Sequence, residues 1–412
     1  MRFAAKEMSP ITPEEQLHII KSGIDTLVPE SLLLEKLKRG KELNIKLGVD
    51  PTAPDIHLGH AVPLRKLRQF QDLGHRVTLI IGDGTALIGD PSGRNSTRPQ
   101  LTREQIAANA QTYVDQAFKI LDPEKTTLRY NSEWILNLDM EKLLKLLSNF
   151  TVARILERDD FHKRYTGGLP IALHEFLYPV MQAYDSVVIE ADIELGGSDQ
   201  LFNLLAGREL MEKMGMEPQV ALTLPLLEGT DGVQKMSKSY GNYIGLTDDA
   251  NDMFGKVMSI PDELMVKYYR LASTASVAEI DEIERGLAAD ELHPNKVKRA
   301  LARNIVAAYH DEEAAAAAEA DFDLKFKEHG FPADAPVFDA DLTPNNEGKV
   351  YFAKVLVDAG AAQSVSEARR LIDGGAVKLN GEALEAKAYN VAPELLAAAE
   401  VQVGKKKFFR LA

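Results

Sequence analysis

The feature that most constrains the fold is a strand pattern that passes through a proline-rich turn into an amphipathic helix pattern. Residues 43–49 have the apolar character of a buried strand, residues 57–73 have helical spacing, and Gly74 follows as a stop. A second buried strand is predicted at 77–81. Such alternation indicates βαβ units on a parallel sheet, which binds its ligands at the carboxyl ends of the strands. The sequence therefore predicts an α/β protein with a Rossmann-like domain.

The rest of the chain divides by pattern into further domains. Residues 1–245 are predicted as the Rossmann-like parallel-sheet domain, with a helical insertion at about 102–166 and a return to sheet near 186–194. Helical spacing recurs at 250–257, 262–271, 277–288 and 294–309, and an alanine run at 314–318 favours helix. These segments predict an all-helical domain at 246–330. Residues 331–345, rich in Pro and Asp, are expected to be a linker, and residues 346–412 a small α+β domain.

Composition excludes several classes of function. The chain has no cysteine, which excludes disulfides, thiolate chemistry and cysteine-bound metals. A net charge of −14 argues against a protein that coats nucleic acid nonspecifically, because such binding needs many Lys and Arg contacts to phosphate. No apolar run is long enough to span a membrane, and the first residues show no export signal, so the expected location is the cytoplasm.

The segment HLGH, residues His57 to His60, stands where the predicted strand gives way to the helix. A helix N-terminus offers unpaired N–H groups and a positive dipole end to phosphate. Gly59 lacks a side chain and would let adenine or ribose approach the backbone, while both imidazoles could donate hydrogen bonds to phosphate oxygens. The alternative is an ordinary helix start with two solvated histidines.

The segment KMSKS, residues Lys235 to Ser239, places two ammonium groups on a loop that runs from Gly229 to Gly241. Such a loop can close over a polyphosphate and stabilise the charge that develops as pyrophosphate leaves. Taken alone, it could be a solvated loop. HLGH and KMSKS in this order, on a sheet pattern, resemble the signatures of class I aminoacyl-tRNA synthetases, in which both motifs meet at one ATP.

Between the two motifs lie residues suited to hold an amino acid. Asp90 follows an apolar strand and is placed to receive an ammonium group, although a surface turn capped by this aspartate would have the same sequence. Helical spacing puts Tyr178, Gln182 and Asp185 on one helix face among apolar neighbours. This pattern favours a pocket, and an ordinary partly buried helix is the alternative.

The resemblance becomes closer with the segments GVDPTAPDIHLGH, IGDPSGRN, LYPVMQAYD, LGGSDQ and KMSKS, which occur in the order found in bacterial tyrosyl-tRNA synthetases and cover nearly the whole chain. The resemblance, to the branch with a KMSKS loop, implies that L-tyrosine is activated with ATP and transferred to the 3′-terminal adenosine of tRNA(Tyr). It also implies a homodimer, with Mg²⁺ carried on ATP or pyrophosphate and no metal held by the protein.

The resemblance also assigns site residues. It implies that Asp90, Tyr178 and Gln182 hold the substrate ammonium, that Asp185 accepts the phenolic hydroxyl, and that Gln200 reaches the carboxylate side. The implied catalytic residues, which act on the departing phosphates, are Thr52, His57, His60, Lys235 and Lys238. The implied ATP-binding residues are Gly48, Asp50, His57, Gly59, His60, Arg94, Arg98, Gly197, Asp199, Lys235, Met236, Ser237, Lys238 and Ser239. A plain tight turn at 196–200 and two surface arginines remain the alternatives for those positions.

One residue departs from the family pattern. Lys46 stands where many relatives have a tyrosine that also touches the substrate hydroxyl, so Asp185 or another group must carry more of that recognition. The assignment to tyrosine instead of tryptophan depends mainly on Asp185, Tyr178 and Gln182. A buried carboxylate that faces a phenol would reject phenylalanine, because that substrate leaves the carboxylate unpaired.

The carboxyl-terminal segment has the pattern of a capped helix from Ser364, followed by a hairpin that turns at Asn380-Gly381. It resembles the small RNA-binding domain named for a ribosomal small-subunit protein, with Arg369, Arg370 and Lys378 offered to phosphates. A solvated helix and an edge strand would have much the same sequence.

Two other classes of function stay open at this point. A nucleotidylyltransferase that makes a dinucleotide cofactor would also place a histidine pair at phosphates, but it does not need an RNA-binding tail. A purely RNA-binding protein with a vestigial sheet would not need HLGH, GGSDQ and KMSKS to be intact.

Overall fold

The computed structural model describes residues 11–51, 56–91, 102–326, 331, 335–346, 348–404 and 407–412. The chain forms two compact units. One consists of Met1–Asp249 with Lys256–Tyr309, and the other of Ala250–Gly255 with His310–Ala412. No helix in the described ranges has the length and apolar character needed to cross a membrane.

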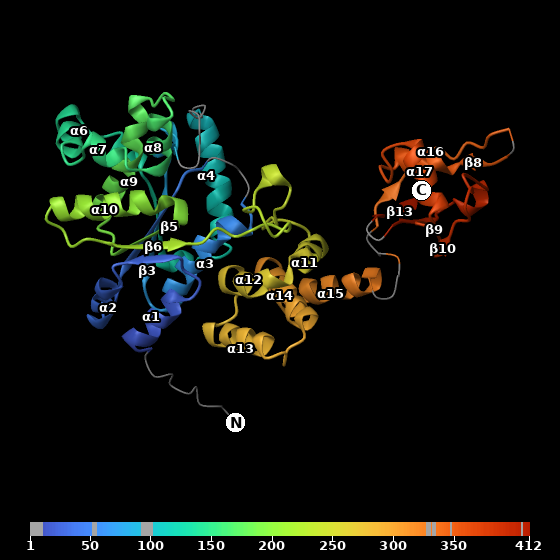
Figure 1. Ribbon diagram of the computed structural model, residues 1–412, viewed down its shortest axis with the longest axis horizontal. Helices are drawn as coiled ribbons and strands as arrows, with labels where there is room; N and C mark the ends of the chain where they lie inside the picture. Colours follow the sequence, from blue (N-terminus) through green and yellow to red (C-terminus); the bar gives the residue numbers. More distant parts are fainter. Residues whose placement is uncertain are drawn as a thin grey trace. The chain divides into compact units, whose positions relative to one another are not determined.

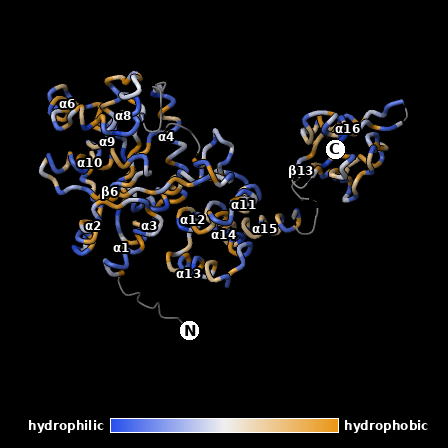
Figure 2. The backbone as a smooth tube through the Cα atoms, viewed as in Figure 1, coloured by the Kyte–Doolittle hydropathy of each residue, from blue (hydrophilic) through white to orange (hydrophobic). Residues whose placement is uncertain are grey.

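The first unit is built on a six-stranded sheet in the order β1-β6-β5-β2-β3-β4 (Figure 1). All neighbouring strands are parallel except β1, which runs antiparallel to β6 at one edge. The central strands are buried, as expected for a sheet covered on both faces, and Figure 2 shows hydrophobic residues at β6. The bounds are β1 (Thr26–Val28), β2 (Asn44–Val49), β3 (Arg76–Ile81), β4 (Thr126–Tyr130), β5 (Ile193–Gly197) and β6 (Val220–Leu224). The predicted α/β fold with a parallel sheet is confirmed.

Helices of the first unit pack on this sheet and on one another. Helix α3 begins after His57, whose backbone is extended, and ends before Gly74, whose φ of +93° suits glycine. Helices α9 and α10 pack together, and α10 also contacts β5 and β6. The helices are α1 (Pro13–Lys21), α2 (Glu30–Lys38), α3 (Leu58–Asp72), α4 (Arg103–Ala117), α5 (Ser132–Ile135), α6 (Met140–Leu147), α7 (Val152–Ile155), α8 (Asp159–Thr166), α9 (Leu177–Val188), α10 (Leu201–Lys213), α12 (Met265–Ala272), α13 (Val277–Ala288) and α14 (Pro294–Tyr309). Helix α11 (Ala250–Ser259) has residues in both units.

Two local predictions were wrong. The stretch predicted as a helical insertion contains β4, which pairs with β3 as the edge strand of the main sheet. The return to sheet was predicted too early, because α9 continues through Val188 and β5 starts only at Ile193. The run Val187-Val188-Ile189 is β-branched, but Val187 and Val188 are the half-buried last residues of α9 and Ile189 is its C-cap. Tertiary packing therefore outweighs local β propensity there.

The second unit contains α15 (Glu312–Phe326) and a small α+β domain. Its five-stranded sheet has the order β10-β9-β12-β13-β7, with β8 and β11 forming a separate pair. Strand β7 lies in the range expected to be a linker and pairs in parallel with β13. The bounds are β7 (Val337–Phe338), β8 (Val350–Tyr351), α16 (Phe352–Asp358), α17 (Val365–Asp373), β9 (Val377–Leu379), β10 (Glu382–Ala383), β11 (Asn390–Val391), β12 (Glu400–Val403) and β13 (Lys407–Leu411).

Local rules explain the shape of this domain. The Ser364 hydroxyl caps α17 by accepting a hydrogen bond from the Glu367 N–H. Asn380 and Gly381 both have positive φ, as a two-residue hairpin turn requires. The core buries Phe352, Leu356 and neighbours from both helices and the sheet.

Candidate functional site

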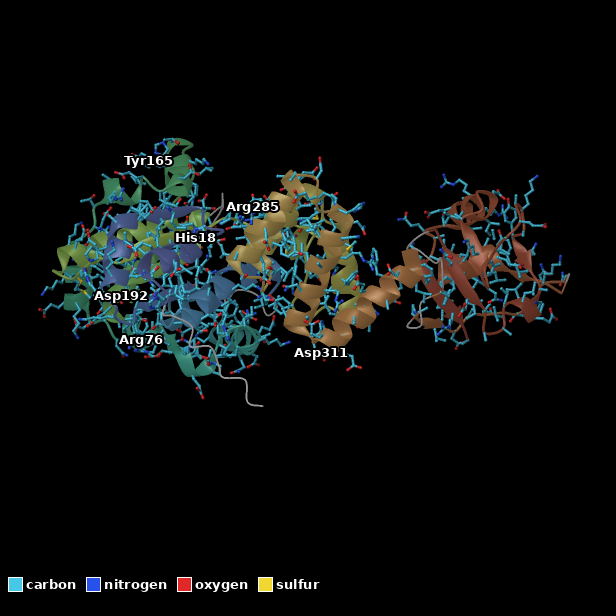
Figure 3. The ribbon with its side chains drawn as sticks, turned by 90° about the horizontal axis from the view of Figure 1, so that it is seen from below. His18, Arg76, Tyr165, Asp192, Arg285 and Asp311 are labelled. Atoms are coloured by element: carbon cyan, nitrogen blue, oxygen red, sulfur yellow. The ribbon has the colours of Figure 1, made fainter. Side chains whose placement is uncertain are left out.

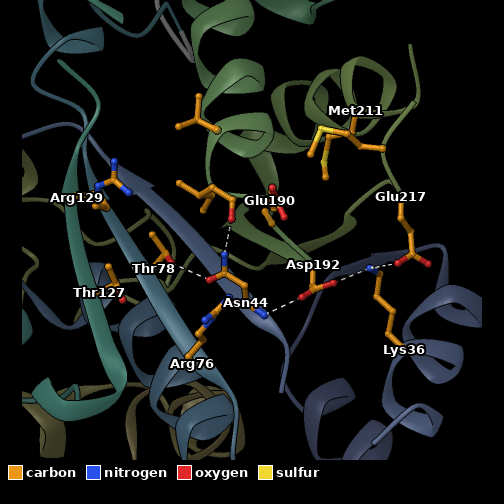
Figure 4. A pocket seen from close by; sticks show the side chains of 14 residues that line it. Lys36, Asn44, Arg76, Thr78, Thr127, Arg129, Glu190, Asp192, Met211 and Glu217 are labelled. Carbon is orange, nitrogen blue, oxygen red and sulfur yellow. Dashed lines mark hydrogen bonds and ion pairs between the residues drawn. The ribbon is translucent and has the colours of Figure 1, made fainter. Parts of the chain in front are cut away.

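Among the cavities of the first unit, two open at opposite ends of the strands. The larger, about 720 Å³, lies at the amino ends of β2, β3 and β4, near Asn44, Thr78 and Thr127 (Figure 4). In this cavity the Lys36 ammonium lies 2.7 Å from Asp192 and 3.1 Å from Glu217.

The smaller cavity, about 200 Å³, lies at the carboxyl ends of β2, β3 and β5, where parallel sheets bind ligands. It is large enough for a group of amino-acid size. Of the residues predicted to bind an amino acid or ATP, it is lined by Gly48, Asp50, Asp90, Tyr178, Gln182, Asp185, Gly197 and Gln200. The helix face predicted on α9 thus contributes all three of its polar residues to one cavity.

Asp185 is the most deeply buried carboxylate of this cavity, at 3% exposure. The indole N–H of Trp134 donates a hydrogen bond to Oδ1 at 2.8 Å, and the Asn131 amide lies 3.3 Å from Oδ2. Burial raises the pKa of Asp185 to about 6, although Lys46 and the two hydrogen bonds oppose the rise. The carboxylate is therefore held in place and ionised at neutral pH.

Asp50 lies at the end of β2 and also lines the cavity. Its carboxylate accepts hydrogen bonds from the Thr85 hydroxyl at 2.8 Å and from the Tyr178 hydroxyl at 3.0 Å. Gly82 faces it, and a Cβ there would collide with the Asp50 carboxylate. Burial and the nearby charge of Asp90 raise the pKa of Asp50 to about 7. A positive group in this cavity would relieve that repulsion.

Asp90 forms an ion pair with Arg158 at 3.1 Å and accepts a hydrogen bond from the Gln200 amide at 3.0 Å. Its side chain is 22% exposed, so it lies nearer the cavity mouth than Asp185. Desolvation and the charge of Asp90 raise the pKa of Asp199, and Lys235 opposes this rise. The charges of Asp90 and of Lys235 in the KMSKS segment thus both act on Asp199.

The HLGH segment forms the N-terminus of α3. The rings of His57 and His60 stack with centroids 3.8 Å apart. Burial lowers the pKa of His57 to about 3, with further lowering by the charges of His60 and Lys238. Desolvation and Lys238 also lower the pKa of His60. Both rings are therefore neutral near pH 7 and can each donate one N–H.

The buried side chain of Asn242, which is 3% exposed, holds the KMSKS loop by hydrogen bonds. Its Oδ1 accepts the Ser237 N–H at 2.9 Å, and its Nδ2 donates to Asp231 at 2.8 Å. Gly229 packs against this side chain so closely that a Cβ would collide with it. Ser237 in turn caps the short turn at Lys238 to Tyr240 and lies 2.8 Å from the Ser239 hydroxyl.

The two motifs lie against each other. A Cβ on Gly59 would be 3.5 Å from the Cβ of Met236, and the Leu58 N–H donates to the Ile244 carbonyl at 2.9 Å. The charge of Lys238 acts on both histidines, and its ammonium lies over the Tyr243 ring. A single anionic ligand could therefore contact the helix start and the loop.

Three predicted residues, Thr52, Arg94 and Arg98, lie outside the described residues. In the second unit, the Arg369 guanidinium donates to the Tyr351 hydroxyl at 2.9 Å and stacks over the Tyr389 ring. Arg370 is exposed on α17, and Lys378 is half-buried on β9.

Sequence reasoning did not find several residues that hold the site together, namely Asn131, Trp134, Arg158, Glu194 and Asn203. Trp134 is the only tryptophan of the chain, which could have drawn attention to it. Glu194 and Lys46 are charged residues inside otherwise apolar strands, and that pattern could have indicated a buried pair.

Comparisons with known proteins show the family of this chain. Residues 38–327 match the family described as tRNA synthetases class I (W and Y), and residues 352–395 match the S4 domain. The chain is 52% identical over 401 residues to a tyrosine–tRNA ligase of Aquifex aeolicus, across 97% of this chain and 99% of that protein. It is 51% identical to a tyrosine–tRNA ligase of Thermotoga maritima, across 97% and 98% of the two chains.

Solved structures show the same fold. A C-terminally truncated mitochondrial tyrosyl-tRNA synthetase of Aspergillus nidulans gives a TM-score of 0.63 at 24% identity, covering 76% of this chain and 94% of that one. The tyrosyl-tRNA synthetase of Archaeoglobus fulgidus, complexed with L-tyrosine, gives 0.61 at 23% identity, covering 74% and 99%.

Proposed function

The chain belongs to the tyrosine–tRNA ligases of synthetase class I, and we propose that its 200 Å³ cavity binds L-tyrosine beside an ATP held by HLGH and KMSKS. The observation that carries this proposal is the cavity itself. Its deepest carboxylate, Asp185, is held by two donors, and the carboxylates of Asp50 and Asp90 also line it.

In this arrangement the phenolic hydroxyl of tyrosine donates to Asp185. The ammonium group is held by Asp90, Tyr178 and Gln182, with Gln200 on the carboxylate side. Asp50 accepts a hydrogen bond from Tyr178 and has a pKa of about 7, so a cation in the cavity would favour its ionised form. Phenylalanine would leave the buried Asp185 carboxylate without its partner and would bind poorly.

The first step joins the substrates without a general base. The tyrosine carboxylate is already ionised and attacks the α-phosphorus of ATP in line, and pyrophosphate leaves. Catalysis then depends on positioning and on groups that stabilise charge as it develops. We assign the latter role to Thr52, His57, His60, Lys235 and Lys238. Gly48, Asp50, Gly59, Arg94, Arg98, Gly197, Asp199, Met236, Ser237 and Ser239 complete the proposed ATP contacts.

ATP and Mg²⁺ enter this proposal as substrates, with the metal carried on the phosphates. In the second step, a ribose hydroxyl of the 3′-terminal adenosine of tRNA(Tyr) attacks the tyrosyl carbonyl carbon of the adenylate, and AMP leaves. Because the reaction consumes ATP and tRNA, we also propose the cytoplasm as its compartment.

Exchange of labelled pyrophosphate into ATP tests the proposal. The pure protein should catalyse exchange that depends on tyrosine. Exchange that instead depends on a mononucleotide would indicate a nucleotidylyltransferase, and no exchange with any partner would indicate a protein that only binds RNA. Either result would overturn the proposal.

The second unit is proposed to bind the tRNA through Arg369, Arg370 and Lys378. Support comes from the S4 match and from Arg369, whose orientation is fixed by Tyr351. The double variant R370A/K378A should raise the KM for tRNA and leave pyrophosphate exchange unchanged. A loss of exchange in that variant would contradict this division of labour.

A homodimer is proposed from the exposed apolar residues of the segment 136–173. Large hydrophobic side chains are unusually exposed there, at 69% for Met140, 60% for Leu144 and 83% for Leu173. Tyr165 is 65% exposed and lies at the surface in Figure 3. Sedimentation should give twice the chain mass of 45.4 kDa, and M140E/L144E should give the monomer. A wild-type monomer at micromolar concentration would contradict the proposal.

A further inference from the structure

A pair of opposite charges is fully buried beside the cavity. Lys46 on β2 and Glu194 on β5 are partners in the parallel register, and their side chains form an ion pair at 2.8 Å. Their exposures are 0% and 1%. Burying two charges is expensive, and such a pair rarely adds net stability compared with apolar residues. Its position next to the helix face of α9 points to another role.

The contacts of Lys46 use all the hydrogen-bond donors of its ammonium group. Besides Glu194, its ammonium donates to the Gln182 carbonyl at 2.9 Å and to the Ser186 hydroxyl at 2.7 Å. An ammonium group has three N–H bonds, and three acceptors take them. Lys46 therefore cannot also donate to the phenolic hydroxyl of tyrosine in this arrangement.

Glu194 is the group that acts on the substrate-facing helix. Its Oε1 accepts the Gln182 amide N–H at 3.2 Å as well as the Lys46 ammonium. Its Oε2 accepts the Ser186 hydroxyl at 3.1 Å. A carboxylate in an ion pair only accepts hydrogen bonds, so the Gln182 amide must turn its NH₂ toward Glu194 and its oxygen away.

A second contact fixes the same orientation. Asn203 donates its amide N–H to the Gln182 Oε1 at 3.0 Å and to the Gln200 Oε1 at 2.7 Å. The Gln200 amide N–H then donates to Asp90 at 3.0 Å. This chain of donors and acceptors ends in a carboxylate on each side, so neither glutamine can reverse its amide without losing two hydrogen bonds.

We propose that the Lys46–Glu194 ion pair is a positioning device for recognition of the substrate ammonium group. It fixes the Gln182 amide so that the oxygen, and not the NH₂ group, faces the tyrosine ammonium. The inference rests on the proposed function and deepens it. A reversed amide would place two N–H donors against a cation and would remove a hydrogen bond to a charged group.

The test removes both charges together, because one charge left alone in this setting could prevent folding. In K46M/E194Q the glutamine amide at position 194 can both donate and accept hydrogen bonds. It therefore no longer fixes the orientation of the Gln182 amide. Two inhibitors each carry one of the two charged groups of tyrosine. Tyramine has the ammonium group and lacks the carboxylate, whereas 3-(4-hydroxyphenyl)propanoate has the carboxylate and lacks the ammonium group.

We expect the KM for tyrosine and the Ki for tyramine to rise together by about tenfold or more. The kcat of pyrophosphate exchange, the Ki of the propanoate and the preference for tyrosine over phenylalanine should stay within about twofold. S186A, which removes a partner of both charges and disturbs packing little, should show the same inhibitor pattern to a smaller degree.

Equal weakening of both inhibitors in these variants would overturn the proposal, because it would indicate general loosening of the pocket. Loss of the preference for tyrosine over phenylalanine with unchanged tyramine binding would also overturn it and would place the effect at the hydroxyl. A matched control is R164M/E175Q, another buried ion pair that does not line the cavity. A wild-type protein without tyrosine-dependent exchange would refute the proposed function itself, separately from these outcomes.

Discussion

The indole Nε1 of Trp134 lies 2.8 Å from Oδ1 of Asp185 and donates a hydrogen bond to it across 51 positions of sequence. Trp134 belongs to α5, which follows the edge strand β4, whereas Asp185 belongs to α9. The segment after β4 therefore provides one wall of the cavity and also holds its deepest carboxylate.

We predict that W134F weakens tyrosine recognition. Without the indole N–H, the Asp185 carboxylate keeps only the longer Asn131 contact of the two. Loss of a hydrogen bond to a charged group corresponds to about 1.5–3 kcal/mol, so the KM for tyrosine should rise about 10- to 100-fold. Steady-state pyrophosphate exchange measures this change. An unchanged KM would show that the hydrogen bond does not orient Asp185.

We predict that D185N stabilises the fold at pH 8 while it damages recognition. The pKa of Asp185 is about 6 in the folded protein and 3.8 in the reference state, so the folded protein binds this proton more readily. The free energy of unfolding therefore falls as pH rises through that range, and the full cost of the buried charge is present above pH 6. One pKa unit corresponds to about 1.4 kcal/mol. The free energy of unfolding of D185N at pH 8 should therefore exceed that of the wild type by about 1–3 kcal/mol.

Urea denaturation at pH 8 and pH 4 measures this gain, which should disappear at the lower pH. D115N, at an exposed position on α4, is the control and should show no comparable gain. A D185N variant less stable than the wild type at pH 8 would contradict the prediction.

We predict that His57 makes the fold sensitive to acid. Its pKa is about 3 in the folded protein against 6.5 in the reference state, so the unfolded chain binds this proton between those values and the folded chain does not. The free energy of unfolding should therefore fall as pH drops below 6.5. Between pH 7 and pH 5, the free energy of unfolding of H57N should fall by about 1–2 kcal/mol less than that of the wild type. Urea denaturation at the two pH values measures this difference. An equal fall in the free energy of unfolding of H57N and the wild type would contradict the prediction.

We predict that N242A slows formation of the adenylate. Asn242 connects Ser237 to Asp231, and its removal leaves the KMSKS loop without that internal fastening. The rate of tyrosine-dependent pyrophosphate exchange should fall about tenfold or more, with the KM for tyrosine unchanged. G229A should act in the same direction, because a Cβ at this position collides with Asn242.

The control for the loop is V233A, since Val233 is 77% exposed in the same segment. It should exchange at the wild-type rate. If V233A and N242A were equally slow, the effect would come from the loop surface and not from the fastening.

Local patterns predicted much of this molecule. The helices expected at 277–288 and 294–309 have those bounds in α13 and α14, because a regular apolar spacing depends only on neighbouring residues. The grouping of Tyr178, Gln182 and Asp185 followed from helix geometry in the same way. Strand β4 was missed, since five residues of mixed polarity at a sheet edge give no clear period.

Contacts between distant segments could not be predicted from pattern alone. The bond from Trp134 to Asp185 and the pair Lys46–Glu194 depend on which strands become neighbours. Sequence reasoning recognised Lys46 as a departure from the family pattern, but it gave no partner for it. The partner follows only from the register of β2 against β5.

The Lys46–Glu194 pair also limits how this enzyme can evolve. Loss of the charge at either position alone leaves a buried charge without its counterion, which typically costs about 3–5 kcal/mol, a large part of the stability of a domain. The substitution of Lys46 by tyrosine is therefore costly unless Glu194 changes as well. The two positions are therefore expected to be inherited and exchanged as one unit, with lineages separated by which pair they carry.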